Sequence, residues 1–600
     1  MIRAAALNPD NWKRVPNLIL VAIAAGLVLL IAWSCGRGLD LLDESHSLLD
    51  ALHPTDSLIG ASTAAGFLGP VFTAVGHDIS LFRFTGLACL VASTIFLACR
   101  TRRLAAEVTN GRLCLSISGL VAASLIGALL YYFWFIRGPS YNLLIVTGSY
   151  LFSGLFLWML EARPGSRSFA VRAMAIGVLW GFCLLVKFPS GVALLALAGM
   201  TFLLWHGWSW RNAGLFAAYF AAGAATLLAL FFLFVEAPGA LFARVSGMFE
   251  MMKSPGFKSP PGGASLVRYV SQSSLGLLKA LQDFWPAFVC VGIGFAAGLA
   301  VRDRTKAILC VTVGFFIALA IFNGVAVRAG FYGWQFTPQD LFYYYFLATA
   351  LVLTTIAGAA IAISRHEGSR IEQIGNKRLS IIVAFLLAVP LAASFGTSNP
   401  ITVNALLAMA PWFIGTTILV TVLSRQCLRN WMGPIAMLTL GTMACADVIS
   451  GAMHPYGIYA TIFEQTERTE LGPGGHSLKL DAPTSSYVTD LRNLANRGGM
   501  NDQSDVMFFY DSPGSVLVIG AHSPGIPWFF SEAPDASIFT LTLVSRERLQ
   551  RAYVLVDLQA PPPPPLSRFG LNFPADYELV GEVLRRPIQH HIQLWRPRVP

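Results

Sequence analysis

Residues 18–36 read LILVAIAAGLVLLIAWSCG and form an apolar run that is long enough to cross a bilayer, because a membrane-spanning helix takes about 20 residues. No small-residue cleavage site follows this run, so we expect a retained helix rather than a removed signal. Runs of the same kind recur along the chain, and we count about 13 of them by this criterion. They cover residues 18–36, 82–99, 113–136, 142–160, 172–187, 190–206, 214–235, 285–301, 307–326, 341–363, 379–396, 402–424 and 432–451.

The composition indicates a protein that is largely covered by lipid. Hydrophobic residues make up 55% of the chain and charged residues 12%, whereas soluble domains carry about 25% charge. The net charge of +10 is spread over short segments between the apolar runs. No basic stripe with interleaved aromatics appears, so we expect no nucleic acid partner. The nine cysteines form no CxxC pair and no zinc-site spacing, and we interpret them as small buried hydrophobic residues.

The basic residues between the runs predict the orientation of the chain. With about 13 helices, the segments rich in Lys and Arg all fall on one side of the membrane, and the positive-inside rule places that side in the cytoplasm. The N-terminus is then cytoplasmic, and an odd number of spans brings the C-terminal region to the outer side. We expect a multi-pass protein of a bacterial inner (cytoplasmic) membrane, with a periplasmic or extracellular C-terminal domain.

The chain divides into a transmembrane part and a C-terminal region. We expect the first over residues 1–451, with outward loops 37–81 and 236–284 that contain amphipathic helices on the membrane surface. Residues 452–600 carry more charge and shorter apolar runs, which predicts a soluble α/β domain. We interpret DVMFFYD, SVLVIGA, IFTLTLV and AYVLVDL as its strands. The predicted fold class is therefore membrane all-α with a C-terminal α/β domain.

An acidic pair lies in the first outward loop, in the sequence LLDESHSLLDALHP (residues 41–54). Asp43 and Glu44 follow the first membrane helix closely, where mutual repulsion and partial desolvation raise the pKa of at least one carboxyl. Such a group suits a general base that removes a proton from an acceptor hydroxyl or amine. The alternative is a solvated loop end that is merely acidic.

The N-terminal 210 residues or so resemble the GT-C superfamily of membrane glycosyltransferases, including the protein mannosyltransferase and aminoarabinose transferase types. The resemblance starts with the Asp-Glu pair after the first helix. It continues through VGHDISLFRFTGLACLVAS (75–93), GPSYNLLIVTGSYLF (138–152) and GVLWGFCLLVKFPSGVALLAL (177–197), in that order. It implies a GT-C type fold and a sugar donor linked to a polyprenyl phosphate.

The resemblance also implies roles for individual residues. Asp43 would be the catalytic base, and Glu44 would orient the acceptor or tune the base. Lys187 would face the donor phosphate, where a cation offsets the charge on the leaving group. An ionisable residue at the end of a membrane helix is costly unless it is used; the alternative for Lys187 is a side chain that snorkels to the interface.

Other polar residues on the outer side have two readings each. Arg137 could hold the donor phosphate or pair with an acid of the first loop, and we expect Arg83 to pair with an acid such as Asp78. Tyr141 and Asn142 could hydrogen-bond the donor or pack against neighbouring helices. The loop that contains Arg328, Tyr332, Trp334 and Gln335 could contact a sugar or anchor the chain at the membrane interface.

Two histidines flank the acidic pair. His46 could contact substrate, and for both His46 and His53 we expect a capping or surface role rather than metal binding. No set of residues completes a metal site, although some members of the superfamily need a divalent metal. We therefore predict no cofactor and leave a divalent metal open.

These observations predict an inverting glycosyltransferase that moves a sugar from a polyprenyl-phosphate donor to a glycan, lipid or protein acceptor on the outer side of the membrane. Neither a GxGxxG motif nor a P-loop is present, in keeping with a donor that is not a nucleotide. A transporter or flippase is the alternative, although the chain has no internal repeat or paired broken helices. A third reading is a non-catalytic scaffold of the same fold whose C-terminal tail binds glycan or protein.

Overall fold

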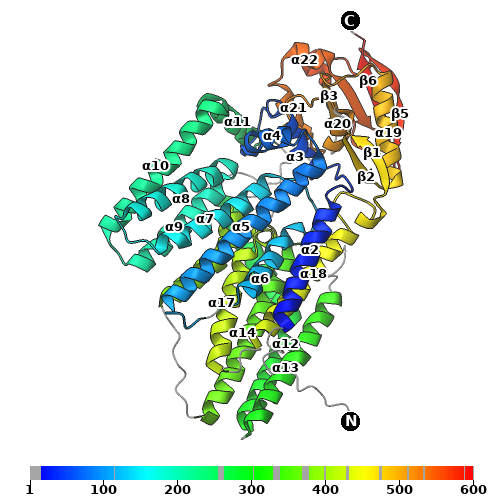
Figure 1. Cartoon of the computed structure of the whole chain (residues 1–600). Coiled ribbons are helices and arrows are strands. Elements are labelled where there is room, and N and C mark those ends of the chain that lie inside the picture. The colour runs from blue at the N-terminus through cyan, green and yellow to red at the C-terminus, as the bar shows by residue number, and fades with distance from the viewer. Residues whose placement is uncertain are drawn as a thin grey trace.

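The computed structural model describes residues 15–113, 115–254, 263–301, 303–328, 338–367, 377–396, 400–427, 432–471, 476–509, 512–531, 534–586 and 588–598. Within these ranges, eleven helices are long and apolar enough to cross a membrane. The chain is a multi-pass membrane protein, and the helices form one bundle (Figure 1). They are α2 (Val15–Ser34), α5 (Ile79–Val108), α7 (Tyr141–Leu160), α8 (Arg167–Val186), α9 (Phe188–His206), α10 (Trp210–Phe234), α12 (Gly263–Ala300), α13 (Arg304–Arg328), α14 (Pro338–Glu367), α15 (Lys377–Ser394) and α18 (Met432–Met453).

Two further predicted spans are helical but are not among the eleven helices that are long and apolar enough to cross. Helix α6 (Ile117–Leu129) continues into the 3-10 turn η1 (Leu130–Tyr132), and α17 (Ala410–Cys427) follows the separate short helix α16 (Ile401–Leu406). The two helices meet inside the bundle, where Gly127 lies against the ring of Phe413. All thirteen apolar runs thus fall on helices, although only eleven reach spanning length within the described residues.

The apolar runs 172–187 and 190–206 form two separate helices, α8 and α9, as predicted. Lys187 is the single residue between the two helices, and its backbone is extended. Pro189 then lies in the first turn of α9, where a proline costs no helical hydrogen bond.

The first outward loop contains two helices, α3 (Asp43–Leu52) and α4 (Ala64–Ala74), and the second contains α11 (Pro238–Met251). Helix α3 packs against the C-terminal region, and the predicted position of the loop helices along the membrane surface stays a prediction. Leu48 and Leu49 of α3 share one hydrophobic core with Leu480, Val488 and Leu594.

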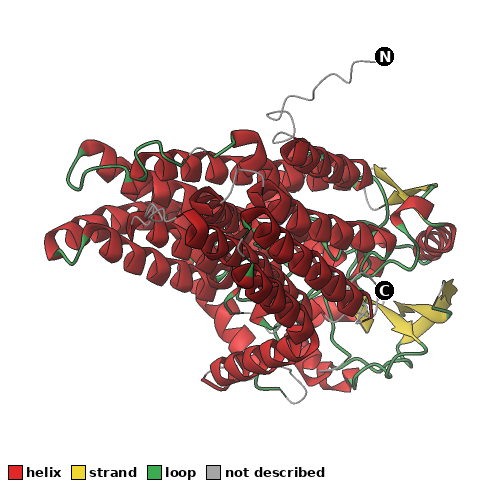
Figure 2. Ribbon diagram, turned by 90° about the horizontal axis from the view of Figure 1, so that it is seen from below, coloured by secondary structure: helices red, strands yellow, loops and turns green. Residues whose placement is uncertain are grey.

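The C-terminal region contains two small sheets, as predicted for an α/β fold. Strands β1 (Glu467–Leu471) and β2 (His476–Leu480) form an antiparallel pair. A four-stranded sheet has the order β3-β4-β6-β5, in which only the β3–β4 pair is parallel. Its strands are β3 (Val506–Phe509), β4 (Tyr553–Asp557), β5 (Tyr577–Arg585) and β6 (His590–Pro597). The strands lie at one end of the helical bundle (Figure 2).

Helices and short turns fill the rest of this region, including two segments that we predicted to be strands. The runs SVLVIGA and IFTLTLV lie largely in helices α20 and α21, so that prediction is wrong. The elements are η2 (Ile462–Glu464), α19 (Ala482–Arg497), α20 (Pro513–Ile519), α21 (Pro534–Leu541), α22 (Arg546–Arg551) and η3 (Leu566–Phe569).

Backbone hydrogen bonds join the first outward loop to the C-terminal region at three places. Gly38 N donates to Lys479 O (2.7 Å), and Lys479 N donates to Gly36 O (2.9 Å). Farther along, Gly514 N donates to Leu41 O (2.9 Å) and Leu58 N donates to Gly525 O (3.0 Å). The C-terminal region therefore holds the loop that carries the predicted acidic pair.

Candidate active site

Asp40 organises the start of α3. Its carboxylate accepts hydrogen bonds from Leu42 N (2.9 Å) and Glu44 N (3.0 Å). It thereby pairs with backbone N–H groups at the start of the helix that have no partner within the helix. Burial raises the pKa of Asp40 to about 8. Sequence reasoning missed this residue, although an aspartate shortly before a helix is a recognisable start signal.

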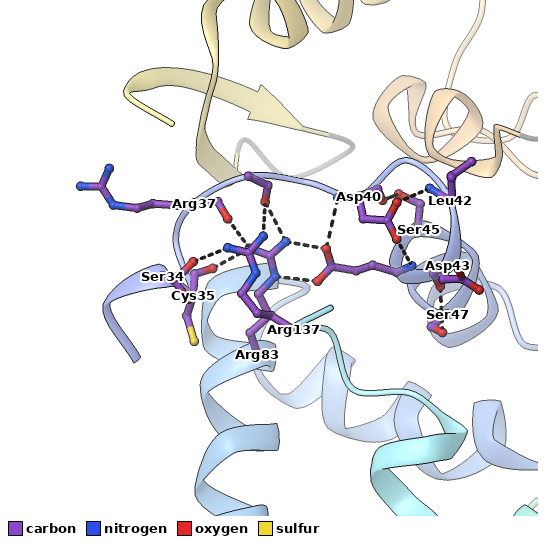
Figure 3. A network of polar contacts seen from close by, with 12 residues as sticks. Ser34, Cys35, Arg37, Asp40, Leu42, Asp43, Ser45, Ser47, Arg83 and Arg137 are labelled. Atoms are coloured by element: carbon purple, nitrogen blue, oxygen red, sulfur yellow. Dashed lines mark hydrogen bonds and ion pairs between the residues drawn. The ribbon is translucent and has the colours of Figure 1, made fainter. Parts of the chain in front are cut away.

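Glu44 forms a buried ion pair with Arg83 of α5. The Nε and Nη2 atoms of Arg83 each lie 2.7 Å from one carboxylate oxygen, and neither side chain is more than 1% exposed. The other N–H groups of Arg83 donate to the backbone carbonyls of Cys35 and Gly38, both at 2.8 Å. One guanidinium thus fixes the chain on both sides of the turn that leads into α3 (Figure 3).

This pair corrects two predictions. Burial alone would raise the pKa of Glu44, but the charge and hydrogen bonds of Arg83 outweigh burial and hold that pKa below its ordinary value. Arg83 does not pair with Asp78, which instead caps α5 by accepting from Ser80 N and Leu81 N (2.7 and 3.0 Å). Because Glu44 is enclosed and charge-paired, its surroundings favour a positioning role over contact with an acceptor.

Arg137 lies beside this pair and is also enclosed. Its Nη1 donates to Ser34 O (2.9 Å) and its Nη2 to Gly38 O (3.4 Å). Burial and the neighbouring charge of Arg83 lower the pKa of Arg137 to about 9. At 1% exposure the side chain presents almost no surface to a phosphate, and its contacts hold the end of α2 in place.

Asp43 differs from its neighbour in being exposed at the head of α3. The hydroxyl of Tyr456 lies near its carboxylate, and burial together with the charge of Asp43 raises the pKa of Tyr456, so this hydroxyl remains protonated. Among the described residues, no cation lies within ion-pair distance of Asp43. Its carboxylate therefore has a neutral hydroxyl nearby and is open to an incoming group. Sequence reasoning missed Tyr456, which lies more than 400 residues away in the chain.

Tyr141 and Asn142 begin α7 close to this carboxylate. Tyr141 lies close enough to Asp43 to interact with its charge. Its ring is 39% exposed. The structure thus places Asp43, Tyr141 and Tyr456 in one neighbourhood, while the substrate role that we predicted for Tyr141 and Asn142 stays a prediction.

His46 follows Asp43 by one helical turn. Its ring meets the edge of Trp528 from the C-terminal region, with centroids 5.9 Å apart, and its Nε2 lies 3.8 Å from Asp50 Oδ2. The C-terminal region therefore brings an aromatic side chain to the helix that carries Asp43. His53 is the C-cap residue of α3, where its backbone N–H donates to Leu49 O (2.8 Å), while the capping or surface role predicted for its side chain stays a prediction.

Lys187 lies at the C-terminal end of α8 with 6% of its surface exposed. Its ammonium approaches Ser394 O at 3.4 Å, and burial lowers the pKa of Lys187 to about 7. In the part of the chain that the structure describes, no carboxylate pairs with it. Ser62 of the first outward loop donates to Val186 O (2.8 Å), so the loop that carries Asp43 also contacts the residue before Lys187.

The remaining predicted site residues lie elsewhere. Arg328 ends α13 and is exposed. Tyr332, Trp334 and Gln335 lie outside the described residues.

No protein-family model matches the chain, and no curated protein matches it. Solved structures do show similarity. The oligosaccharyltransferase of Archaeoglobus fulgidus is 12% identical, with 90% of this chain and 68% of that chain covered and a TM-score of 0.43. ArnT from Cupriavidus metallidurans is 11% identical, with 96% and 97% covered and a TM-score of 0.40. Both are GT-C glycosyltransferases, the superfamily that the sequence resembles. At these TM-scores the likeness is loose, so the functional argument rests on the side chains.

Proposed function

We propose that this protein is an inverting glycosyltransferase that uses a polyprenyl-phosphate sugar. The exposed carboxylate of Asp43 carries the proposal. It stands at the head of a helix that Asp40 and the Glu44–Arg83 pair hold rigidly, and a base held in this way suits proton abstraction in a fixed direction.

In this reaction, Asp43 takes the proton from an acceptor hydroxyl or amine. The acceptor atom attacks the anomeric carbon from the face opposite the phosphate, and the bond from that carbon to the phosphate oxygen breaks. The polyprenyl phosphate leaves with the bonding electrons, so the configuration at the anomeric carbon inverts. A hydrogen bond from the nearby hydroxyl of Tyr456 would keep the carboxylate aimed at the acceptor.

Lys187 is the proposed partner of the donor phosphate. A buried ammonium without a carboxylate partner among the described residues is costly, and an arriving phosphate would relieve that cost by pairing with it. The ArnT structure contains undecaprenyl phosphate. We propose a lipid phosphate of this class for the present chain because of Lys187, not because of that loose likeness.

The proposed orientation places α3, Lys187 and the C-terminal region outside the cytoplasmic membrane of a bacterium, with the N-terminus inside. It requires α6 and α17 to cross together with the eleven longer helices. Cysteines placed at the exposed positions Arg163 and Asp502, in a background without other reactive cysteines, test it. Only the cysteine at position 502 should react with a membrane-impermeant maleimide in intact cells; labelling of both or of only position 163 would contradict the orientation.

The decisive experiment compares Asp43→Asn with Asp50→Asn, a change of the same kind on the same helix. Membranes that contain each variant are supplied with undecaprenyl phosphate carrying a radiolabelled sugar, and transfer to endogenous acceptor is measured. Loss of a general base should reduce the rate by about 10²–10⁴-fold for Asp43→Asn, with Asp50→Asn close to wild type. Full transfer by a folded Asp43→Asn variant would sink the assignment.

A further inference from the structure

A cluster of potential metal ligands joins the first outward loop to the C-terminal region. It consists of His53 and Asp56 from the loop and His522 from the segment after α20. One donor atom from each residue lies within 4.8 Å of the other two. Sequence reasoning could not find this set, because His522 is separated from the other two residues by more than 460 positions.

One buried imidazole nitrogen of the cluster has no hydrogen-bond partner among the described residues. His522 Nδ1 lies 2.6 Å from Asp56 Oδ2, and the rings of His53 and His522 lie against each other with centroids 3.8 Å apart. The Nε2 atom of His53 is buried and has no hydrogen-bond partner among the described residues. A buried, unsatisfied imidazole nitrogen is costly, and a metal ion would satisfy it.

The surroundings of Asp56 suit a cation. Its second oxygen, Oδ1, accepts from Arg548 Nη2 (2.9 Å), which orients the carboxylate and leaves Oδ2 facing the histidines. Arg548 is itself paired with both oxygens of Asp505, at 2.6–3.0 Å. Two carboxylates share one guanidinium, so with neutral imidazoles the group has a net negative charge. Carboxylates that bind metals are usually hydrogen-bonded by an outer partner in this way.

We propose that His53, Asp56 and His522 bind a divalent transition-metal ion, with Zn²⁺ the best match. Two imidazole nitrogens and one carboxylate oxygen are ligands that zinc prefers, and water would complete a tetrahedral site. The ion would replace the direct contact between Asp56 and His522, so a modest side-chain shift suffices to form the site.

This site is structural and independent of the proposed transfer reaction. His53 ends α3 and Asp43 begins it, so the two are separated by ten residues of helix, about 15 Å at the usual rise. The ion would fasten the loop that carries Asp43 to the C-terminal region, next to the contact between Leu58 and Gly525.

The test uses the purified full-length chain in detergent, stripped with EDTA and then titrated with Zn²⁺. His53→Gln is the main variant, because it leaves the pair between Asp56 and His522 intact, and His522→Gln is the second. His590→Gln is the matched control, since His590 Nδ1 also contacts a carboxylate, Asp557 Oδ2, at 2.7 Å but belongs to no ligand cluster among the described residues. Bound zinc is counted by mass spectrometry after gel filtration, and thermal unfolding is followed with and without zinc.

Wild type and His590→Gln should each retain one zinc ion per chain and unfold at a higher temperature when zinc is present. Loss of an outer-shell partner typically lowers metal affinity by about 10–100-fold. In both ligand variants the zinc affinity should fall by more than this, and zinc should no longer raise the unfolding temperature. Wild type that retains no zinc, or a folded His53→Gln variant with wild-type affinity, would overturn the proposal.

Discussion

Glu44 and Arg83 face each other in a two-pronged ion pair with both contacts at 2.7 Å, and water reaches neither side chain appreciably. The pair joins α3 to α5 across 39 residues of sequence. The same guanidinium also binds the carbonyls at the end of α2. This one side chain therefore helps to fix the orientation of α3 and hence of Asp43.

Removing one member of the pair should destabilise the protein strongly. Arg83→Met leaves the carboxylate of Glu44 buried without a partner, which typically costs about 3–5 kcal/mol. The midpoint of thermal unfolding of the purified protein in detergent should fall accordingly. Glu578→Gln is the control, because it breaks the exposed pair between Glu578 and Arg596 and should leave the midpoint unchanged. Equal effects of the two changes would contradict the role assigned to the buried pair.

The different roles of Asp43 and Glu44 could not be predicted from their adjacency. A helix turns by about 100° per residue, so neighbours point in different directions, and only the position of Arg83 decides which carboxylate is enclosed. The sequence did contain Arg83 inside an apolar run, where an arginine needs a partner. Asp78 is closer to Arg83 along the chain than Glu44 is, but Asp78 is the N-cap residue of α5 and its carboxylate accepts from backbone N–H groups there.

Donor binding should weaken as the pH rises through neutrality. Burial lowers the pKa of Lys187 to about 7, so the ammonium is present below this pH and is lost above it in the free enzyme. The KM for a polyprenyl-phosphate sugar should therefore rise by up to about tenfold per pH unit above about pH 7. The kcat should change little over the same range.

Lys187→Arg provides the control for this pH dependence. A guanidinium keeps its charge at and above neutral pH, so the KM of the Lys187→Arg variant should vary less with pH than that of wild type. The different geometry of arginine can make this KM higher than the wild-type value at every pH. Lys187→Met should have a high KM that does not improve at low pH. A wild-type KM that stays constant from about pH 6 to about pH 9 would argue against Lys187 as the phosphate partner.

The C-terminal region shows where local sequence patterns mislead. SVLVIGA and IFTLTLV are short apolar runs, which periodicity cannot assign to strand or helix. The better signals were Pro513 and Pro534 at the helix starts and Gly520, which ends α20 in the left-handed conformation. The long membrane helices were predictable because bilayer thickness fixes their length, whereas contacts such as Trp528 with His46 depend on tertiary packing alone.

Helices α8 and α10 contact each other through two glycines. Gly177 of α8 lies directly against the backbone carbonyl of Phe220, and Gly223 of α10 lies against that of Met174, so neither position has room for a Cβ atom. Small residues that let two backbones approach closely are a common means of packing helices in membranes. Gly177→Ala should force the helices apart and destabilise the protein by about 1–3 kcal/mol, measured as a lower midpoint of thermal unfolding in detergent.

Gly199 on the adjacent helix α9 gives a matched comparison, because a Cβ atom there would meet nothing within 4 Å. Alanine is the better helix former by about 1 kcal/mol, so Gly199→Ala should leave the midpoint unchanged or raise it. The two substitutions are chemically identical and differ only in the space around the added methyl group. Opposite signs would therefore assign the effect to the α8–α10 contact, and a Gly177→Ala variant as stable as Gly199→Ala would refute it.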